Sequence, residues 1–151
     1  MSDAARILIV DDDHEILTTF SAMLRGEGYV VDTAENGRSA IEKCNADFYN
    51  LALIDIRLPD MEGTQLLTAL KETTPKMVKI IVTGYPSLEN AVEAVNKGAD
   101  GYIIKPAQSN DLLQRLKEQL RKQQAEKEYG EQKIKGYIET RQKELDSKEK
   151  R

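Results

Sequence analysis

Four short apolar runs of the sequence each end at side chains that could do chemistry. The runs are I-L-I-V at 7–10, L-A-L-I at 51–54, K-I-I-V-T at 79–83 and G-Y-I-I at 101–104. The polar residues at their ends are Asp11, Asp12 and Asp13 after the first run, Asp55 after the second, Thr83 in the third and Lys105 after the fourth. If the runs are parallel strands, their carboxyl ends meet at one edge of a sheet. The sequence therefore predicts carboxylates, a hydroxyl and an ammonium in one place.

That combination favours phosphoryl chemistry with a divalent cation. Neighbouring carboxylates raise one another's pKa, and a cation removes this conflict. Mg²⁺ takes oxygen ligands and usually keeps positions for water and phosphate oxygens, and Mn²⁺ is a possible substitute. Asp55 could attack phosphorus and form an acyl phosphate. Thr83 could hydrogen-bond a phosphoryl oxygen, and Lys105 could offset its charge.

Each residue also has an ordinary explanation when it is taken alone. Asp13 is well placed to cap the helix that follows, and we adopt this interpretation for it. Thr83 before Gly84 could be a simple strand exit, and Lys105 could be a surface lysine. His14, the one histidine of the chain, is interpreted as a surface residue. Reactive groups at four strand ends together, rather than any single residue, favour a functional site.

The elements that must position these groups follow from the apolar pattern. The four runs and a fifth, Y-V-V-D-T-A at 29–34, are mostly continuous and rich in Val and Ile, which is typical of parallel strands covered on both faces. Helical patterns lie between them, with Asn36 and Ser87 as candidate N-caps. Five strands alternating with five helices predict an α/β doubly wound fold.

Length and composition limit the remaining choices. A chain of 151 residues fits one domain with an appendage. Its net charge of -4 gives no reason to expect nucleic-acid binding. Cys44 is the one cysteine, so no intrachain disulfide is expected, and no apolar run approaches the roughly 20 residues of a membrane helix. We therefore predict a cytoplasmic protein with no nucleic-acid partner and no membrane contact.

The C-terminal part of the chain has a different character. We predict a domain over 5–122 and a charged extension over 123–151 that is helical or partly disordered. Two glycines weaken a long uninterrupted helix there, Gly130 and Gly136. Apolar residues nevertheless return at helical spacing, at Ile134, Tyr137, Ile138 and Leu145. The extension is either a solvated helix or one that pairs with a copy of itself or with a partner.

The strand-end blocks resemble the receiver domain of two-component response regulators. The matching blocks are I-L-I-V-D-D-D at 7–13, L-I-D-I-R-L-P-D-M-E-G at 53–63, V-T-G at 82–84 and Y-I-I-K-P at 102–106. The resemblance covers about residues 5–122. It implies a flavodoxin-like (βα)5 fold whose five-stranded parallel sheet has the order 2-1-3-4-5.

The resemblance also implies roles for single residues. Asp55 would be the phosphoacceptor. Asp12, Asp55 and the backbone carbonyl of Arg57 would bind Mg²⁺, with Asp11 acting mainly through water. Lys105 would contact the phosphoryl group.

Other implied roles concern the response to phosphorylation. Thr83 would move toward the phosphate while Tyr102 turns inward, and the Lys105–Pro106 peptide would be cis. We add the hypothesis that Arg57 and Tyr85 overhang the site and that Tyr85 lengthens the lifetime of the acyl phosphate by shielding it from water.

The implied function is a stand-alone response regulator rather than a turnover enzyme. A phosphohistidine on a sensor histidine kinase would be the donor, and the switched surface, from the fourth to the fifth helix, would contact an unidentified downstream protein. That surface or the extension could also form a homodimer.

Two other functions are weighed against this one. A Mg²⁺-dependent phosphohydrolase similar to the haloacid dehalogenases would need D-x-D-x-[TV] after the first strand, where residues 11–15 read D-D-D-H-E. A flavodoxin-like binding module would need a phosphate loop rich in glycine and hydroxyls after the first strand, where this chain has three aspartates.

Overall fold

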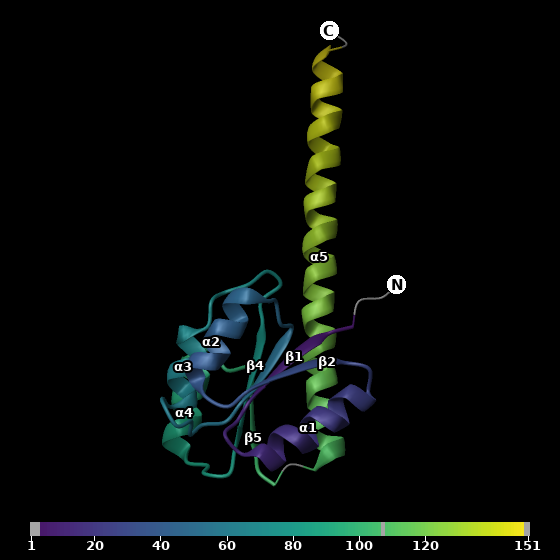
Figure 1. Cartoon of the computed structure of the whole chain (residues 1–151). Helices are drawn as coiled ribbons and strands as arrows, with labels where there is room; N and C mark the ends of the chain where they lie inside the picture. The colour runs from purple at the N-terminus through teal and green to yellow at the C-terminus, as the bar shows by residue number, and fades with distance from the viewer. Residues whose placement is uncertain (1–3, 107, 150–151) are drawn as a thin grey trace.

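The structure, a computed structural model, describes residues 4–106 and 108–149 and alternates strands with helices (Figure 1). The elements in chain order are β1 (Arg6–Val10), α1 (His14–Gly26), β2 (Val30–Ala34), α2 (Gly37–Ala46), β3 (Leu51–Ile54), α3 (Gly63–Ala69), β4 (Val78–Thr83), α4 (Leu88–Asn96), β5 (Gly101–Ile104) and α5 (Ser109–Glu149). The predicted α/β doubly wound fold is confirmed.

The strands form one parallel sheet of order β2-β1-β3-β4-β5, as predicted. Val10, the last residue of β1, pairs with Ala34 on one side and Ile54 on the other, and Thr83 pairs with Ile104. The strands therefore end in register at one edge of the sheet. This register is what brings residues from distant parts of the sequence together there.

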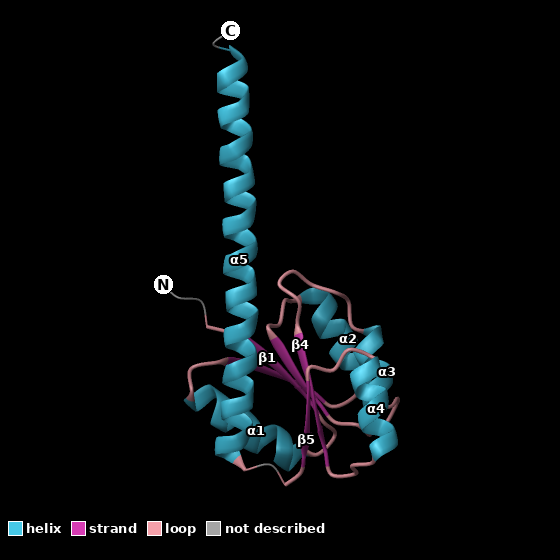
Figure 2. Cartoon of the chain, turned by 180° about the vertical axis from the view of Figure 1, so that it is seen from behind, coloured by secondary structure: helices cyan, strands magenta, loops and turns pink. Residues whose placement is uncertain are grey.

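Helices cover both faces of the sheet, and each face has its own core (Figures 1 and 2). Side chains of α2, α3 and α4 pack on one face, where Leu66 and Leu67 are almost completely buried. The other face packs against α1 and the first turns of α5, which bury Leu24, Leu112 and Leu116. This double cover explains the continuous apolar strands, since both faces of the sheet lie against helices.

The predicted helix starts are confirmed by their capping hydrogen bonds. The side chain of Asp13 accepts from the backbone N–H of Glu15, that of Asn36 from Ser39, and that of Ser87 from Asn90. Such caps satisfy backbone donors that the helix itself leaves without a partner. They also fix where each strand-to-helix loop turns at the edge that carries the polar residues.

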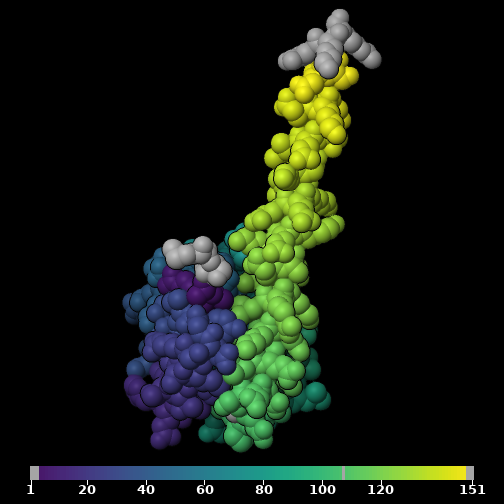
Figure 3. Space-filling model, turned by 90° about the vertical axis from the view of Figure 1, so that its right-hand side faces the viewer, coloured from purple at the N-terminus to yellow at the C-terminus, as the bar shows by residue number. Residues whose placement is uncertain are grey.

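The extension is a continuation of α5, a single helix of 41 residues. It passes through Gly130 and Gly136, whose cost of roughly 1 kcal/mol each is small beside the many good helix formers around them. Figure 3 shows it projecting from the body of the molecule. Its large apolar residues are exposed there, at Tyr129, Ile134, Tyr137, Ile138 and Leu145. Among the described residues, none of the helices has the length and apolar character needed to cross a bilayer.

Gln123 anchors α5 to the sheet just before it leaves the body. Its buried side chain donates to the backbone carbonyls of Asn50 and Lys76, at 2.9 and 2.8 Å, and accepts from the Asn50 side chain at 3.0 Å. Asn50 and Lys76 precede β3 and β4. The extension therefore leaves at the edge opposite the carboxyl ends of the strands.

Candidate functional site

The backbone of the sheet holds the polar residues at the carboxyl edge. The N–H of Asp11 donates to the carbonyl of Ala34 at 3.0 Å, and that of Asp55 donates to Val10 at 2.9 Å. The N–H of Lys105 donates to Thr83 at 2.7 Å. Strand pairing thus continues one residue beyond the apolar runs. The backbone of the first polar residue after each of these strands is therefore fixed by hydrogen bonds to the neighbouring strand.

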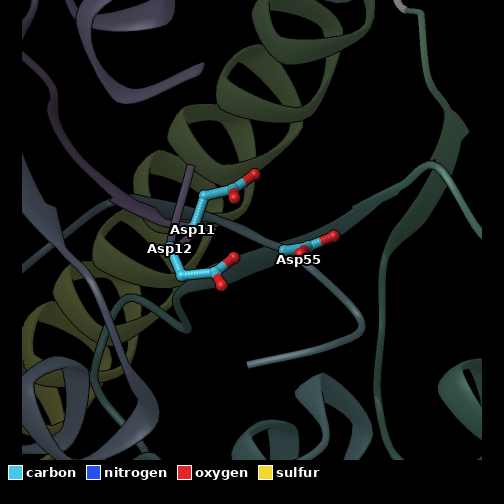
Figure 4. A group of neighbouring side chains, drawn as sticks. All are labelled: Asp11, Asp12 and Asp55. Carbon is cyan, nitrogen blue, oxygen red and sulfur yellow. The ribbon is translucent and has the colours of Figure 1, made fainter. Parts of the chain in front are cut away.

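Three carboxylates meet at this edge, those of Asp11, Asp12 and Asp55 (Figure 4). One oxygen from each lies within 4.8 Å of the others. Asp11 and Asp55 are buried, with 3% and 7% of their surface exposed, whereas Asp12 is exposed. Two charges are therefore held out of water and a third faces it, which leaves the cluster open on one side.

Lys105 lies against the buried pair. Its Nζ is 2.7 Å from Asp11 Oδ2 and 3.5 Å from Asp55 Oδ1. Burial lowers the pKa of this ammonium, but the hydrogen bond to Asp11 and the charges of Asp11 and Asp55 outweigh burial and raise it overall. Lys105 is therefore charged at neutral pH, and one ammonium faces two buried carboxylates.

Asp55 is the least satisfied of these groups. Its Oδ1 is buried and makes no hydrogen bond within the described part of the chain. Burial, and then the charge of Asp11, raise the pKa of Asp55 to about 6, although Lys105 lowers it. A buried carboxylate oxygen without a hydrogen bond is costly even beside an ammonium 3.5 Å away, and a cation relieves that cost. A cluster of three carboxylates that opens to water on one side suits a hard divalent cation such as Mg²⁺, so the residues fit the expected ion.

Thr83 and Tyr102 lie on neighbouring strands next to this cluster. Thr83 is fully buried, and its Oγ1 accepts from the backbone N–H of Tyr85 at 2.9 Å. Tyr102 is half-buried, and its hydroxyl donates to the side chain of Asn90 on α4. Of the predicted switch pair, Thr83 is thus tied to the segment between β4 and α4, and Tyr102 is tied to the first turn of α4.

The two residues that were expected to overhang the site touch each other. The guanidinium carbon of Arg57 lies 4.2 Å from the centre of the Tyr85 ring, a cation–π contact. Both side chains are exposed, and they follow Asp55 and Thr83 by two positions. The Lys105–Pro106 peptide bond is cis, as is Thr74–Pro75.

The loop after Asp55 is held by two residues, Asp60 and Gly63, for which sequence reasoning assigned no role. Asp60 accepts from the backbone N–H groups of Gly37 and Arg38, both at 2.9 Å, and these bonds lower its pKa. A Cβ on Gly63 would come within 2.2 Å of the backbone oxygen of Asp55. Nothing local distinguishes Asp60 from other loop carboxylates, but the glycine at the start of a helix was a signal of close packing.

Two residues lie outside the site, and one of them, His14, is at the surface, as predicted. His14 is exposed at the start of α1, with Nε2 3.4 Å from Glu35 Oε1. Cys44 is buried, and burial raises the pKa of its thiol. Neither residue joins the carboxylate cluster.

Comparison with known proteins assigns the domain. Residues 7–117 match the response regulator receiver domain family. The transcriptional regulatory protein ZraR of Escherichia coli K12 is 40% identical over 118 residues, which are 78% of this chain and 27% of ZraR. The corresponding protein of Klebsiella oxytoca is 42% identical over 76% of this chain and 26% of its own length.

Solved structures agree. A CheY-like receiver domain protein of Methanospirillum hungatei JF-1 superposes with a TM-score of 0.79 at 50% identity, over 82% of this chain and 99% of that one. The beryllofluoride-activated NtrC4 receiver domain dimer superposes with a TM-score of 0.73 at 35% identity, over 78% of this chain and 98% of that one.

These comparisons correct one prediction. The net charge of -4 led us to exclude a nucleic-acid partner, but the curated relatives are transcriptional regulatory proteins. The chain spans about a quarter of their length. The exclusion was wrong because the charge of a domain describes only its own surface. It carries no information about segments joined to such a domain in longer proteins.

Proposed function

Because the chain belongs to the response regulator receiver domain family, we propose that it accepts a phosphoryl group on Asp55 and passes the change to its surface. The observation that supports this most directly is the Asp55 carboxylate itself. It is buried beside Asp11, one of its oxygens lacks a hydrogen bond among the described residues, and Lys105 lies 3.5 Å away. This is a nucleophile facing a charge-neutralising group at an open edge.

Asp11, Asp12, Asp55 and the backbone carbonyl of Arg57 are the proposed ligands of Mg²⁺, which Mn²⁺ could replace. The bound ion would neutralise charge on the phosphoryl oxygens. Lys105 neutralises charge from the other side, since its ammonium already contacts both buried carboxylates. Phosphoryl transfer is catalysed mainly by this kind of placement and charge compensation.

In the proposed transfer, a carboxylate oxygen of Asp55 forms a bond to phosphorus. The bond between phosphorus and a histidine nitrogen of a sensor kinase breaks, and that nitrogen keeps the electron pair. With a pKa of about 6, Asp55 is mostly ionised at neutral pH and can attack without a general base. Hydrolysis of the acyl phosphate restores the carboxylate, so the chain is a phosphoacceptor and not a turnover enzyme for an external substrate.

We propose that Thr83 responds to the phosphoryl group on Asp55. Its oxygen accepts from Tyr85, which leaves its own proton free to donate to a phosphoryl oxygen. That bond exists only in the phosphorylated protein, so it stabilises the conformation in which Thr83 has moved and Tyr102 has turned inward. Arg57 and Tyr85 are proposed to slow the attack of water on the acyl phosphate.

The test uses the full chain, Mg²⁺ and acetyl phosphate, with intact-protein mass spectrometry as the readout. We expect one phosphate adduct on the wild type, none after Asp55→Asn, and none when the metal is chelated. Asp13→Asn is a matched control, because asparagine also caps a helix and Asp13 is not a proposed ligand. An adduct that persists in Asp55→Asn, or a wild type that gains none, contradicts the proposal.

A further inference from the structure

Asn90, in the first turn of α4, uses its whole side chain to connect other parts of the site. Its Nδ2 donates to the backbone carbonyl of Tyr85 at 3.0 Å. Its Oδ1 accepts from the hydroxyl of Tyr102 and from the backbone N–H of Ser87 at 3.3 Å. A side-chain amide can make all of these bonds because its nitrogen carries donors and its oxygen is an acceptor in the same plane.

These bonds complete a connection between the two residues of the switch pair. Thr83 Oγ1 accepts from the N–H of Tyr85, and the carbonyl of the same Tyr85 accepts from Asn90. Asn90 in turn holds the hydroxyl of Tyr102. Thr83 lies on β4 and Tyr102 on β5, so they are neighbours in the sheet, but the path between their polar groups runs through α4.

The position of Asn90 makes this path adjustable. The residue is half-buried, and all four residues between Thr83 and α4 are exposed, namely Gly84, Tyr85, Pro86 and Ser87. Only Ala94 of α4 is buried. A segment with so little burial can shift at low cost, and its side-chain hydrogen bonds then decide between the alternatives.

We propose that Asn90 is the positioning residue that couples Tyr102 to Thr83. It holds the tyrosine hydroxyl at α4 and the Tyr85 peptide in place, and the inward turn of Tyr102 requires the first of these bonds to break. Asn90 therefore stabilises the conformation with Tyr102 at α4 and opposes the phosphorylated one. This inference rests on the proposed function and adds a residue that neither the family blocks nor the carboxylate cluster includes.

The experiment measures the affinity of the magnesium-loaded full chain for beryllofluoride, an analogue of the phosphoryl group, by NMR titration. Of the three hydrogen bonds that Asn90→Ala removes, only the one to Tyr102 must break in the inward turn, and its loss at ordinary strength predicts about fivefold tighter binding. Tyr102→Phe removes the same bond from the other side and should have a similar effect. The double variant should bind no more tightly than either single variant, because all three lack the same bond.

Two further variants separate coupling from a general effect on α4. Asn90→Asp keeps the acceptor for Tyr102 and Ser87 but loses the donor to Tyr85, so it tests the second bond alone while the carboxylate still suits a helix start. Asn96→Ala changes an exposed asparagine at the other end of α4 and should leave the affinity unchanged.

The outcomes distinguish this inference from the function on which it rests. If the wild type binds no beryllofluoride, the phosphoacceptor function fails and the role of Asn90 fails with it. If the wild type binds but Asn90→Ala is unchanged or weaker, or if the effects of Asn90→Ala and Tyr102→Phe simply add, only the role of Asn90 is overturned.

Discussion

Replacing Asp55 by asparagine should stabilise the metal-free protein. Asn has nearly the same shape but carries no charge. Burial and the charge of Asp11 raise the pKa of Asp55 from 3.8 to about 6, which means that the folded protein resists ionising this group. A rise of that size corresponds to about 3 kcal/mol in the free energy of unfolding once the carboxyl is fully ionised. We therefore expect Asp55→Asn to raise the free energy of unfolding at pH 7 by up to about 3 kcal/mol.

The direction of the pH dependence follows from the same shift. A carboxyl whose pKa is raised in the folded state binds its proton more tightly there than in the unfolded chain, so the wild type loses stability as pH rises from about 4 to 6. Asn cannot titrate. The advantage of Asp55→Asn over the wild type should therefore grow by about 1 kcal/mol between pH 5 and pH 7.

Urea denaturation in the presence of EDTA, followed by circular dichroism at several pH values, measures this difference. Asp12→Asn is the matched control, because it removes a carboxylate of the same cluster that is exposed to water and should change stability much less. Added Mg²⁺ should narrow the gap, since it binds only the folded wild type well. Equal stability of wild type and Asp55→Asn at every pH would refute the argument from burial.

Three other changes test the site. Lys105→Met removes the ammonium beside Asp55, and the rate of phosphorylation by acetyl phosphate should fall by about 10²-fold, measured by mass spectrometry over time; an unchanged rate would exclude its proposed role. Tyr85→Ala removes the ring that stacks on Arg57, and decay of the acyl phosphate should quicken by about two- to fivefold, measured with a radiolabelled phosphoryl group; equal lifetimes would contradict shielding. Gly63→Ala places a methyl against the Asp55 backbone and should lower the free energy of unfolding, measured by urea titration, by about 1–3 kcal/mol. Gly130→Ala adds a methyl in open space and should not lower the free energy of unfolding.

The fold was predictable because its signals are local. Each strand is a short run of Val, Ile and Leu, each helix start carries its own cap, and parallel strands in this arrangement place their ends at one edge. Asp11, Asp55, Thr83 and Lys105 could therefore be grouped from the sequence, because each is the polar residue at the end of a strand.

The residues that escaped prediction act across elements. Asp60 reaches the start of α2, Gln123 reaches the loops before β3 and β4, and Asn90 reaches Tyr102 on β5. Such contacts between a side chain and a distant segment depend on how loops turn, and nothing in the residue type or its spacing specifies the partner. The extension, predicted to be helical or partly disordered, is one continuous helix through its two glycines, because propensity is a weak guide when many neighbours favour a helix.

The two helices α4 and α5 differ in how firmly they are held, and this indicates where a signal from Asp55 can go. Gln123 fixes α5 to two loops with three hydrogen bonds, and Leu112 and Leu116 of the same helix are fully buried. In contrast, α4 buries one residue and exposes Leu88, Val92 and Val95. A change at Thr83 therefore meets least resistance in α4. The extension, fixed by its anchor, can follow only if the whole of α5 moves as a rigid body.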